Sequence, residues 1–265
     1  MVAKVFAVTN QKGGVGKTTT SVNLAASLAA TRRRILLIDL DPQGNATMGS
    51  GINKNEIENS AYELLTKKAS INNVLVRSEL GKYDVIPANG DLTAAEVELL
   101  NEIGREHRLK KVLAEVRENY EFIIIDCPPS LNMLTVNALS AADGVLIPMQ
   151  CEYYALEGLA ALMGTVEQIK ETVNPGLEIS GILRTMYDPR NSLTRDVSSE
   201  LQEHFGDKLY KVAIPRNVRL AEAPSYGMSV LHYDKNSKGS LAYLALAGEI
   251  VRKFKAESKK TVKHN

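Results

Sequence analysis

The sequence predicts an α/β protein with a doubly wound, mostly parallel sheet flanked by helices. Short, continuous apolar runs alternate along the chain with longer segments whose apolar residues have helical spacing. Continuous runs are typical of strands buried on both faces, and their alternation with helices is typical of a parallel sheet. A glycine-rich segment, residues 12–19, follows the first run and opens the first helical segment. Strand, glycine-rich turn and helix together form the context of a phosphate-binding loop.

The apolar runs and the helical spacing give the expected order of elements. Strands are expected at residues 5–8, 35–38, 83–88, 122–126, 144–149, 179–186 and 211–215. After a first helix that opens near residue 17, helices are expected at residues 61–65, 92–100, 107–119, 132–142, 155–173, 193–204 and 239–255. Residues 49–59 have the composition of a loop, and residues 74–80 fit either class. Without an internal repeat or a low-complexity linker, residues 1–255 are predicted to form a single domain, and residues 256–265 a basic, disordered tail.

The glycine-rich segment is the candidate nucleotide site. Its residues are Lys12, Gly13, Gly14, Val15, Gly16, Lys17, Thr18 and Thr19. Glycines allow tight turns that point successive N–H groups at phosphate oxygens, and the following helix adds its positive N-terminus. In such a loop Lys17 reaches the terminal phosphates, and the Thr18 hydroxyl binds Mg²⁺. The general pattern has a glycine at position 11, where this chain has Gln11, with Lys12 as an additional lysine.

The pattern K-G-G-x-G-K-T-T resembles the deviant Walker A box of the MinD/ParA branch of P-loop ATPases. That resemblance implies ATP as the nucleotide and an ATP-sandwich homodimer. It also implies a catalytic role for Lys12, which would contact the nucleotide held by the partner subunit. Spacing alone indicates only a nucleotide phosphate site, and the alternative for Lys12 is a solvated loop residue.

The second apolar run ends in two acids, Asp39 and Asp41. Acids at the carboxyl end of a buried parallel strand lie where open α/β sheets bind ligands. The pattern D-x-D-P-Q-G-N resembles the switch I segment of ParA-type ATPases. The resemblance implies that Asp41 is catalytic, positioning or deprotonating the attacking water close to Mg²⁺, with Asp39 in support. The alternative for Asp41 is a turn-forming residue before proline.

The run at residues 122–126 has the Walker B pattern, four apolar residues followed by Asp126. After a phosphate-binding loop, this pattern predicts that Asp126 holds Mg²⁺ through water. Residues 127–130, Cys-Pro-Pro-Ser, resemble the switch II segment of the same family. We interpret Cys127 as a small buried residue.

Residues 215–227 are similar to the P-R-N-x-x-L-x-E-A-P-S-x-G signature of ParA/Soj proteins. The resemblance implies that Pro215, Arg216 and Asn217 contact the adenine, although an ordinary strand-to-helix turn also fits these residues. It further implies that Arg190 and Arg219 contact DNA. For an exposed arginine the alternative is a solvated charge or a surface ion pair.

Composition limits the other function classes. The chain of 265 residues has a formal net charge of +1 and a sequence pI of about 7.7, so composition does not indicate a nucleic-acid binder. We expect Cys127 and Cys151, which are far apart in the sequence, to be reduced thiols, and two cysteines are too few for an iron–sulfur site. The four histidines lack the spacing of metal ligands. Because no signal peptide and no apolar run of about 18 residues is present, we expect a cytoplasmic protein without a membrane partner.

Together the motifs identify the chain as a member of the ParA/Soj branch, resembling small chromosomal partition ATPases. The resemblance implies that an ATP-bound dimer binds double-stranded DNA non-specifically, in association with the nucleoid. It implies release when a ParB-type centromere-binding protein stimulates hydrolysis, with slow intrinsic turnover. Because the phosphate loop opens near residue 1, we expect no N-terminal DNA-reading domain.

Two alternatives stay open. One is a MinD-like division-site ATPase, whose C-terminal membrane helix needs a broad apolar face. Here the C-terminal segment offers only Phe254 and Val262 as large apolar residues. The other is a binding module that uses the nucleotide as a structural clamp with negligible hydrolysis, against which Asp41 argues.

Overall fold

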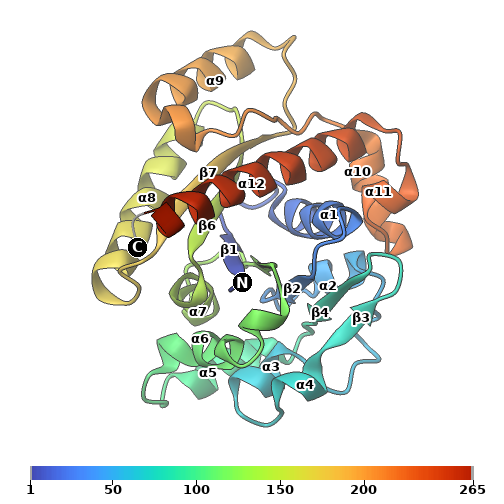
Figure 1. The fold of residues 1–265 in the computed structure, drawn as a ribbon, viewed down its shortest axis with the longest axis vertical. Helices are drawn as coiled ribbons and strands as arrows, with labels where there is room; N and C mark the ends of the chain where they lie inside the picture. The colour runs from blue at the N-terminus through green and yellow to red at the C-terminus, as the bar shows by residue number, and fades with distance from the viewer. Residues whose placement is uncertain (1, 264–265) are drawn as a thin grey trace.

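The computed structural model describes residues 2–263 and has a layer of helices on each face of one twisted sheet (Figure 1). Within these residues the sheet has seven strands in the order β3-β4-β2-β5-β1-β6-β7. All neighbouring strands are parallel except β3, which pairs antiparallel with β4. The predicted fold class, a doubly wound and mostly parallel α/β sheet, is confirmed.

The strands are β1 (Lys4–Val8), β2 (Ile35–Asp39), β3 (Val76–Ser78), β4 (Tyr83–Ile86), β5 (Phe122–Asp126), β6 (Gly144–Gln150) and β7 (Glu178–Thr185). The α-helices are α1 (Lys17–Ala30), α2 (Asn45–Gly49), α3 (Ala61–Leu65), α4 (Ile71–Val74), α5 (Leu92–Leu99), α6 (Arg108–Ala114), α7 (Met133–Ala141), α8 (Ala155–Thr172), α9 (Ser192–Phe205), α10 (Val218–Glu222), α11 (Val230–Tyr233) and α12 (Lys238–Lys263). Short 3-10 helices are η1 (Arg105–His107), η2 (Arg117–Asn119), η3 (Gly206–Lys208) and η4 (Ala223–Tyr226).

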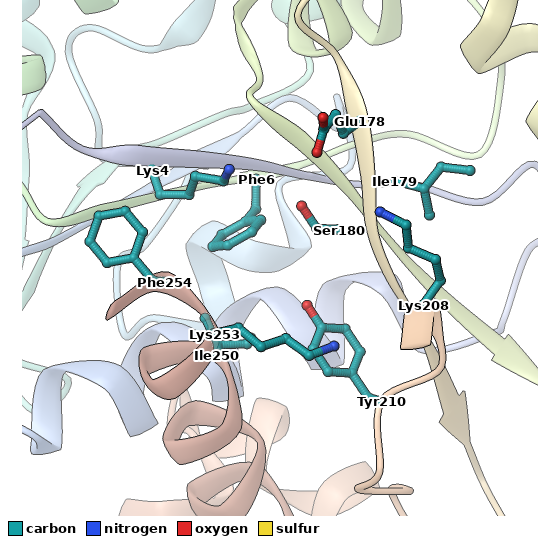
Figure 2. Close-up of a pocket in the computed structure, with 10 residues that line it drawn as sticks. All are labelled: Lys4, Phe6, Glu178, Ile179, Ser180, Lys208, Tyr210, Ile250, Lys253 and Phe254. Atoms are coloured by element: carbon teal, nitrogen blue, oxygen red, sulfur yellow. The ribbon is translucent and has the colours of Figure 1, made fainter. Parts of the chain in front are cut away.

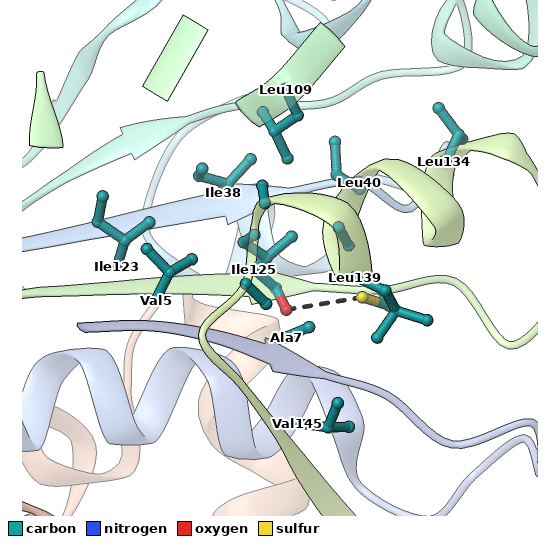
Figure 3. Packing of buried hydrophobic residues seen from close by; sticks show 14 of the residues in the cluster. Val5, Ala7, Ile38, Leu40, Leu109, Ile123, Ile125, Leu134, Leu139 and Val145 are labelled. Atoms are coloured by element: carbon teal, nitrogen blue, oxygen red, sulfur yellow. Dashed lines mark hydrogen bonds between the residues drawn. The ribbon is translucent and has the colours of Figure 1, made fainter. Parts of the chain in front are cut away.

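The apolar runs build two cores, one on each face of the sheet. Successive side chains of a strand point to opposite faces. In β1, Val5 and Ala7 therefore pack into the core under α3 and α5–α8, whereas Phe6 and Val8 pack under α1 and α12. Figure 3 shows the first core, where helix residues such as Leu139 lie against the strand side chains. Continuous apolar runs are required because both faces are covered.

The strand order brings three loops to one edge of the sheet. β1 lies between β5 and β6, and β5 lies between β1 and β2. In this register Val8 pairs with Asp126, and Asp39 pairs with the same aspartate from the other side. The segments that follow Val8, Asp39 and Asp126 therefore leave the sheet side by side, at its carboxyl edge, where open α/β sheets bind ligands.

Several predicted elements are corrected. Residues 211–215 do not form a strand; the segment has one isolated bridge, between Pro215 and Tyr187. The backbone N–H groups of Lys211 and Val212 donate instead to the Glu249 carboxylate of α12, at 3.1 and 3.2 Å. The Glu249 carboxylate thus takes the place of a strand partner at these two residues, whereas the Ile214 N–H still donates to the Arg184 carbonyl of β7 at 2.8 Å.

The helix predicted at residues 107–119 is broken into η1, α6 and η2, because the chain turns at Val116 before it enters β5. Residues 74–80, which fitted either class, hold the end of α4 and all of β3. Helix α2 directly after the switch I segment was not predicted. The last helix, α12, continues past residue 255 as far as Lys263, so residues 256–263 are helical where we expected a disordered tail, and residues 264–265 lie outside the described residues.

Both cysteines are free thiols, as predicted, and Cys127 is buried, also as predicted; Cys151 is buried as well. Within residues 2–263 no helix is both long enough and apolar enough to cross a bilayer.

Candidate nucleotide-binding site

The loop between β1 and α1 is shaped to receive an anion. Gly14 and Gly16 have φ angles of +73° and +87°, a region that glycine adopts readily and other residues rarely do. Helix α1 begins without a side-chain cap, so its first N–H groups can face a ligand. The Lys17 Nζ folds back to donate to the Lys12 carbonyl at 3.1 Å. Burial lowers the pKa of Lys17, although nearby Asp126 opposes this effect.

Asp126 is the buried carboxylate of the site. Its Oδ2 accepts a hydrogen bond from the Thr18 hydroxyl at 2.8 Å, and its Oδ1 accepts one from Ser21 at 2.7 Å. Burial, reinforced by neighbouring Asp39, raises the pKa of Asp126 to about 8. A cation beside this carboxylate would compensate the cost of its buried charge.

The donor set around Asp126 fits magnesium better than a transition metal. Mg²⁺ prefers oxygen ligands and usually keeps several waters, with only one or two carboxylates and substrate phosphates. Thr18 and Asp126 supply a hydroxyl and a carboxylate oxygen at one point. Among the residues that the structure describes, no group of three or more His, Cys, Asp or Glu side chains forms a dedicated metal cage.

Asp39 anchors the segment that follows β2. Its Oδ2 accepts hydrogen bonds from both the backbone N–H and the hydroxyl of Thr47, each at 2.8 Å, and its Oδ1 accepts from the Asp41 N–H at 3.1 Å. Burial raises the pKa of Asp39 to about 6. Asp41 is half-buried and accepts from the Gln43 N–H at 3.0 Å. Asp39 therefore fixes the backbone that presents Asp41.

Lys12 is paired within its own chain. Its Nζ lies 2.6 Å from the Glu152 Oε2, and both side chains are about half exposed. The Lys12 N–H donates to Asn10, whose side chain donates in turn to the carbonyl of Pro148 in β6. Exposed ion pairs contribute about 0 to 1 kcal/mol. Lys12 can therefore exchange Glu152 for another partner at small cost.

The three candidate adenine contacts lie beside the phosphate loop. Pro215, Arg216 and Asn217 line a cavity of about 340 Å³ together with Gly16 and Thr19. This volume is within the usual range of small-ligand sites, about 300 to 1,000 Å³. Asn217 also caps α10, because its Oδ1 accepts from the Arg219 N–H at 3.0 Å. Asn217 can therefore both cap the helix of a strand-to-helix turn and face the base site, so the two predictions for this residue are compatible.

The two candidate DNA contacts are exposed, and each is paired with a carboxylate. Arg190 donates to both oxygens of Asp188, at 2.9 and 2.7 Å. Arg219 lies 2.8 Å from Glu222 and 3.4 Å from Asp234. Any phosphate would have to compete with these acids, so a DNA role for either arginine stays a prediction.

Several residues of the site were not found from the sequence. Ser21 lies three residues after Thr18 on α1, so helical spacing could have placed it beside the same carboxylate. Thr185 donates to the Val15 carbonyl at 2.8 Å, and Glu152 pairs with Lys12. Both come from strands or loops more than 130 residues away, and no local pattern marks them.

A second pocket lies at the opposite edge of the sheet, near the amino ends of β1 and β7 (Figure 2). Lys4, Glu178 and Lys208 are among its lining residues, with Lys253 and Phe254 from α12. Its volume is only about 50 Å³, too small for a nucleotide by the range given above. The site at the carboxyl edge is therefore the candidate for nucleotide binding.

Comparison with known proteins agrees with this geometry. The sequence model of a family described as an AAA domain matches residues 3–179. The sporulation initiation inhibitor protein Soj of Bacillus subtilis is 52% identical, over 94% of this chain and 98% of that protein. The chromosome partitioning protein ParA of Caulobacter vibrioides is 51% identical, over 94% of each chain. A solved structure of a cobyrinic acid a,c-diamide synthase from Mycobacterium smegmatis, with a bound ATP analog and magnesium, is 37% identical, covers 97% of each chain and superimposes with a TM-score of 0.85.

The fold and the glycine-rich loop define a P-loop NTPase of the class with a second lysine at the front of the loop. Within that class, the chain belongs to the ParA/Soj family of chromosome partitioning ATPases. The family predicted from the sequence motifs is thereby confirmed.

Replacing Asp126 by asparagine should separate magnesium binding from folding. Asp126→Asn keeps the shape and removes the charge that attracts a cation. Its one oxygen still accepts from Thr18 or Ser21, and the hydroxyl on the other side can rotate to accept from the new amide NH2. We expect the Mg²⁺-dependent gain in ATP affinity to fall by about 10- to 100-fold, the scale for losing a supporting group at a metal site. Isothermal titration with and without Mg²⁺ measures this gain. Asp196→Asn, an exposed change on α9, is the control. An unchanged gain would contradict the assignment.

Proposed function

We propose that this chain is an ATP-dependent DNA partition protein whose ATP- and Mg²⁺-bound homodimer binds double-stranded DNA without sequence preference. The observation that carries the proposal is the position of Lys12: it lies at the front of the phosphate loop, and its side chain is exposed. Its intramolecular ion pair with Glu152 is weak enough to be exchanged. In the dimer, Lys12 of each copy contacts the phosphates bound by the other.

Within one copy, the site residues divide the work of nucleotide binding. The loop from Lys12 to Thr19 holds the phosphates, while Pro215, Arg216 and Asn217 contact the base. Mg²⁺ would be held by Thr18 and Asp126, with Asp41 close to it, and when bound it neutralises phosphate charge. Asp41 orients the attacking water. Asp39 holds the Asp41 backbone directly, by accepting from the Asp41 N–H, and anchors the following segment through Thr47.

DNA binding by the dimer follows from charge addition. The monomer carries a net charge of only +1, and the carboxylates beside Arg190 and Arg219 reduce the local field. Two copies on one DNA segment double the number of phosphate contacts. Because each contact releases counterions, affinity rises steeply with their number and falls with salt. Contacts to phosphates carry no sequence information, which fits association with the nucleoid.

Release from DNA requires hydrolysis. Arg216, the arginine beside the phosphate loop, is assigned to the base, which leaves no arginine assigned to the terminal phosphates. Intrinsic turnover should therefore be slow, with Lys12 of the partner as the candidate stabilising charge. We propose that a ParB-type centromere-binding protein accelerates this step. The family described above supports such a partner, and the residues that would bind it stay unassigned.

The MinD-like alternative is less well supported. Of the two large apolar residues near the C-terminus, Phe254 packs edge-on against the buried Phe122, with ring centroids 5.2 Å apart. Because this ring packs against the core, it does not contribute to a membrane-binding face. Val262 alone would not make such a face.

Removing the Asp41 carboxylate should stop turnover without preventing assembly. We expect Asp41→Ala to bind ATP and dimerise, but to hydrolyse ATP about 10²- to 10⁴-fold more slowly, the usual contribution of a general base or water-positioning group. Phosphate release in the presence of DNA measures the rate, and the exposed Asp91→Ala provides the control. Turnover that survives in Asp41→Ala would remove this residue from catalysis. Negligible turnover in the wild type would favour the nucleotide-clamp alternative.

Reversing the charge of Arg219 should weaken DNA binding alone. We expect Arg219→Glu to dimerise with ATP and to bind DNA at least about tenfold more weakly. Because a dimer loses two contacts, the slope of log affinity against log salt should decrease by about 2. Fluorescence anisotropy with labelled duplex DNA over a salt series measures both. Arg34→Glu, at the amino end of β2 and away from the site, should change neither. Normal binding by Arg219→Glu would exclude this arginine.

A further inference from the structure

Two exposed aromatic rings stand next to the Lys12–Glu152 pair. Tyr153 and Tyr154 directly follow Glu152 and are 75% and 70% exposed. Their rings contact each other edge to face, with centroids 4.9 Å apart. Tyrosines bury a large area at low entropic cost and are enriched in the cores of protein interfaces. The pair therefore forms a preformed projection on the surface that carries Lys12.

An apolar groove lies on the other side of the phosphate loop. It has a volume of about 420 Å³ and is formed by α1, α2 and η4 with the segment that follows. Its apolar lining comes from Val22, Met48, Pro224 and Met228, and it opens beside Thr18 and Thr19 of the phosphate loop. Met48 is 39% exposed in the groove. Methionine side chains adapt readily to the shape of an incoming group.

The sheet topology places the projection and the groove on opposite sides of the phosphate loop. The groove residue Met48 belongs to the segment after β2, the phosphate loop follows β1, and the tyrosines follow β6. Along the sheet these strands are ordered β2, β5, β1, β6. Under a two-fold axis that passes near Lys12 and lies perpendicular to the direction of the strand order, what lies on one side of the loop in one copy faces what lies on the other side in its partner.

The charges of this surface are also self-complementary. Lys12 and Glu152 supply one cation and one anion at 2.6 Å. Two copies that meet through this surface therefore bring two Lys12 and two Glu152 side chains together, so these side chains add no net charge to the interface. Each Lys12 can leave its own Glu152 while the total number of charges at the interface stays balanced.

We propose that in the ATP-bound dimer the Tyr153–Tyr154 pair of each copy packs into the groove of the other copy, against Met48 and Met228. This inference rests on the proposed ATP-dependent dimer and assigns its contacts. The groove opens beside Thr18 and Thr19 of the phosphate loop. The tyrosines of the second copy therefore cover the side of the loop that the first copy leaves open. Nucleotide binding and dimer contact are then coupled through the same helix, α1.

Cross-linking between differently tagged copies tests the contact. A Tyr154→Cys copy is mixed with a Met48→Cys copy, and a short bismaleimide is added with ATP and Mg²⁺, with ADP, or without nucleotide. The natural thiols, Cys127 and Cys151, are buried, so the introduced thiols react first. We expect at least tenfold more cross-linked heterodimer with ATP than with ADP. Ile103→Cys, 99% exposed, replaces Tyr154→Cys in the control and should give no such gain.

The outcomes separate this inference from the proposed function. The wild-type chain is examined in parallel by sedimentation velocity with ATP and Mg²⁺. A wild-type dimer whose cysteine pair cross-links no better than the Ile103→Cys control would overturn the assigned contact and leave the dimer intact. A wild-type chain that stays monomeric would overturn the dimer and the contact together. Cross-linking above the control, only with ATP, supports both.

Discussion

The pairing of β1 with β5 is the constraint on which the site depends. It sets Val8 opposite Asp126, so the phosphate loop leaves the sheet beside a buried carboxylate that comes more than 100 residues later. Thr18 and Ser21 then bind the two oxygens of that carboxylate from the first turns of α1. The loop, the helix and the strand end are thus held as one unit. A shift of β1 by one residue would turn its apolar side chains to the wrong faces and separate these groups.

Two carboxylates are buried at the carboxyl edge of the sheet, and burying their negative charge is costly. Asp39 and Asp126 are both fully buried, and burial raises the pKa of each. Asp39 accepts hydrogen bonds from the backbone N–H of Asp41 and from the backbone N–H and hydroxyl of Thr47, so its role is structural. The position of Asp41, half-buried at the same edge, follows from that support. We expect a site built in this way to bind a metal cation and a phosphate chain more favourably together than either alone, because the cation offsets the negative charge of both the carboxylates and the phosphates.

Sequence reasoning predicted the layers of the fold and the motifs of the site, since both are encoded locally. Continuous apolar runs mark strands buried on two faces, and glycines mark a loop with positive φ angles. Contacts between distant segments were not predictable. The run at residues 211–215 looked like a strand, yet the N–H groups of Lys211 and Val212 donate to Glu249 of α12. Glu152 carries no motif that marks it as the partner of Lys12, because a surface acid 140 residues away acquires this partner only when the chain folds.

The central claim is that ATP, held between two copies through Lys12, creates the surface that binds DNA. Its most direct test is the affinity of wild-type and Lys12→Ala protein for a labelled duplex, measured by anisotropy with ATP, with ADP and without nucleotide. Lys110→Ala, an exposed lysine on α6, is the control. The account predicts tight binding only for ATP-loaded wild type and control, with Lys12→Ala weak in every state. Equal binding with and without ATP, or full binding by Lys12→Ala, would contradict it.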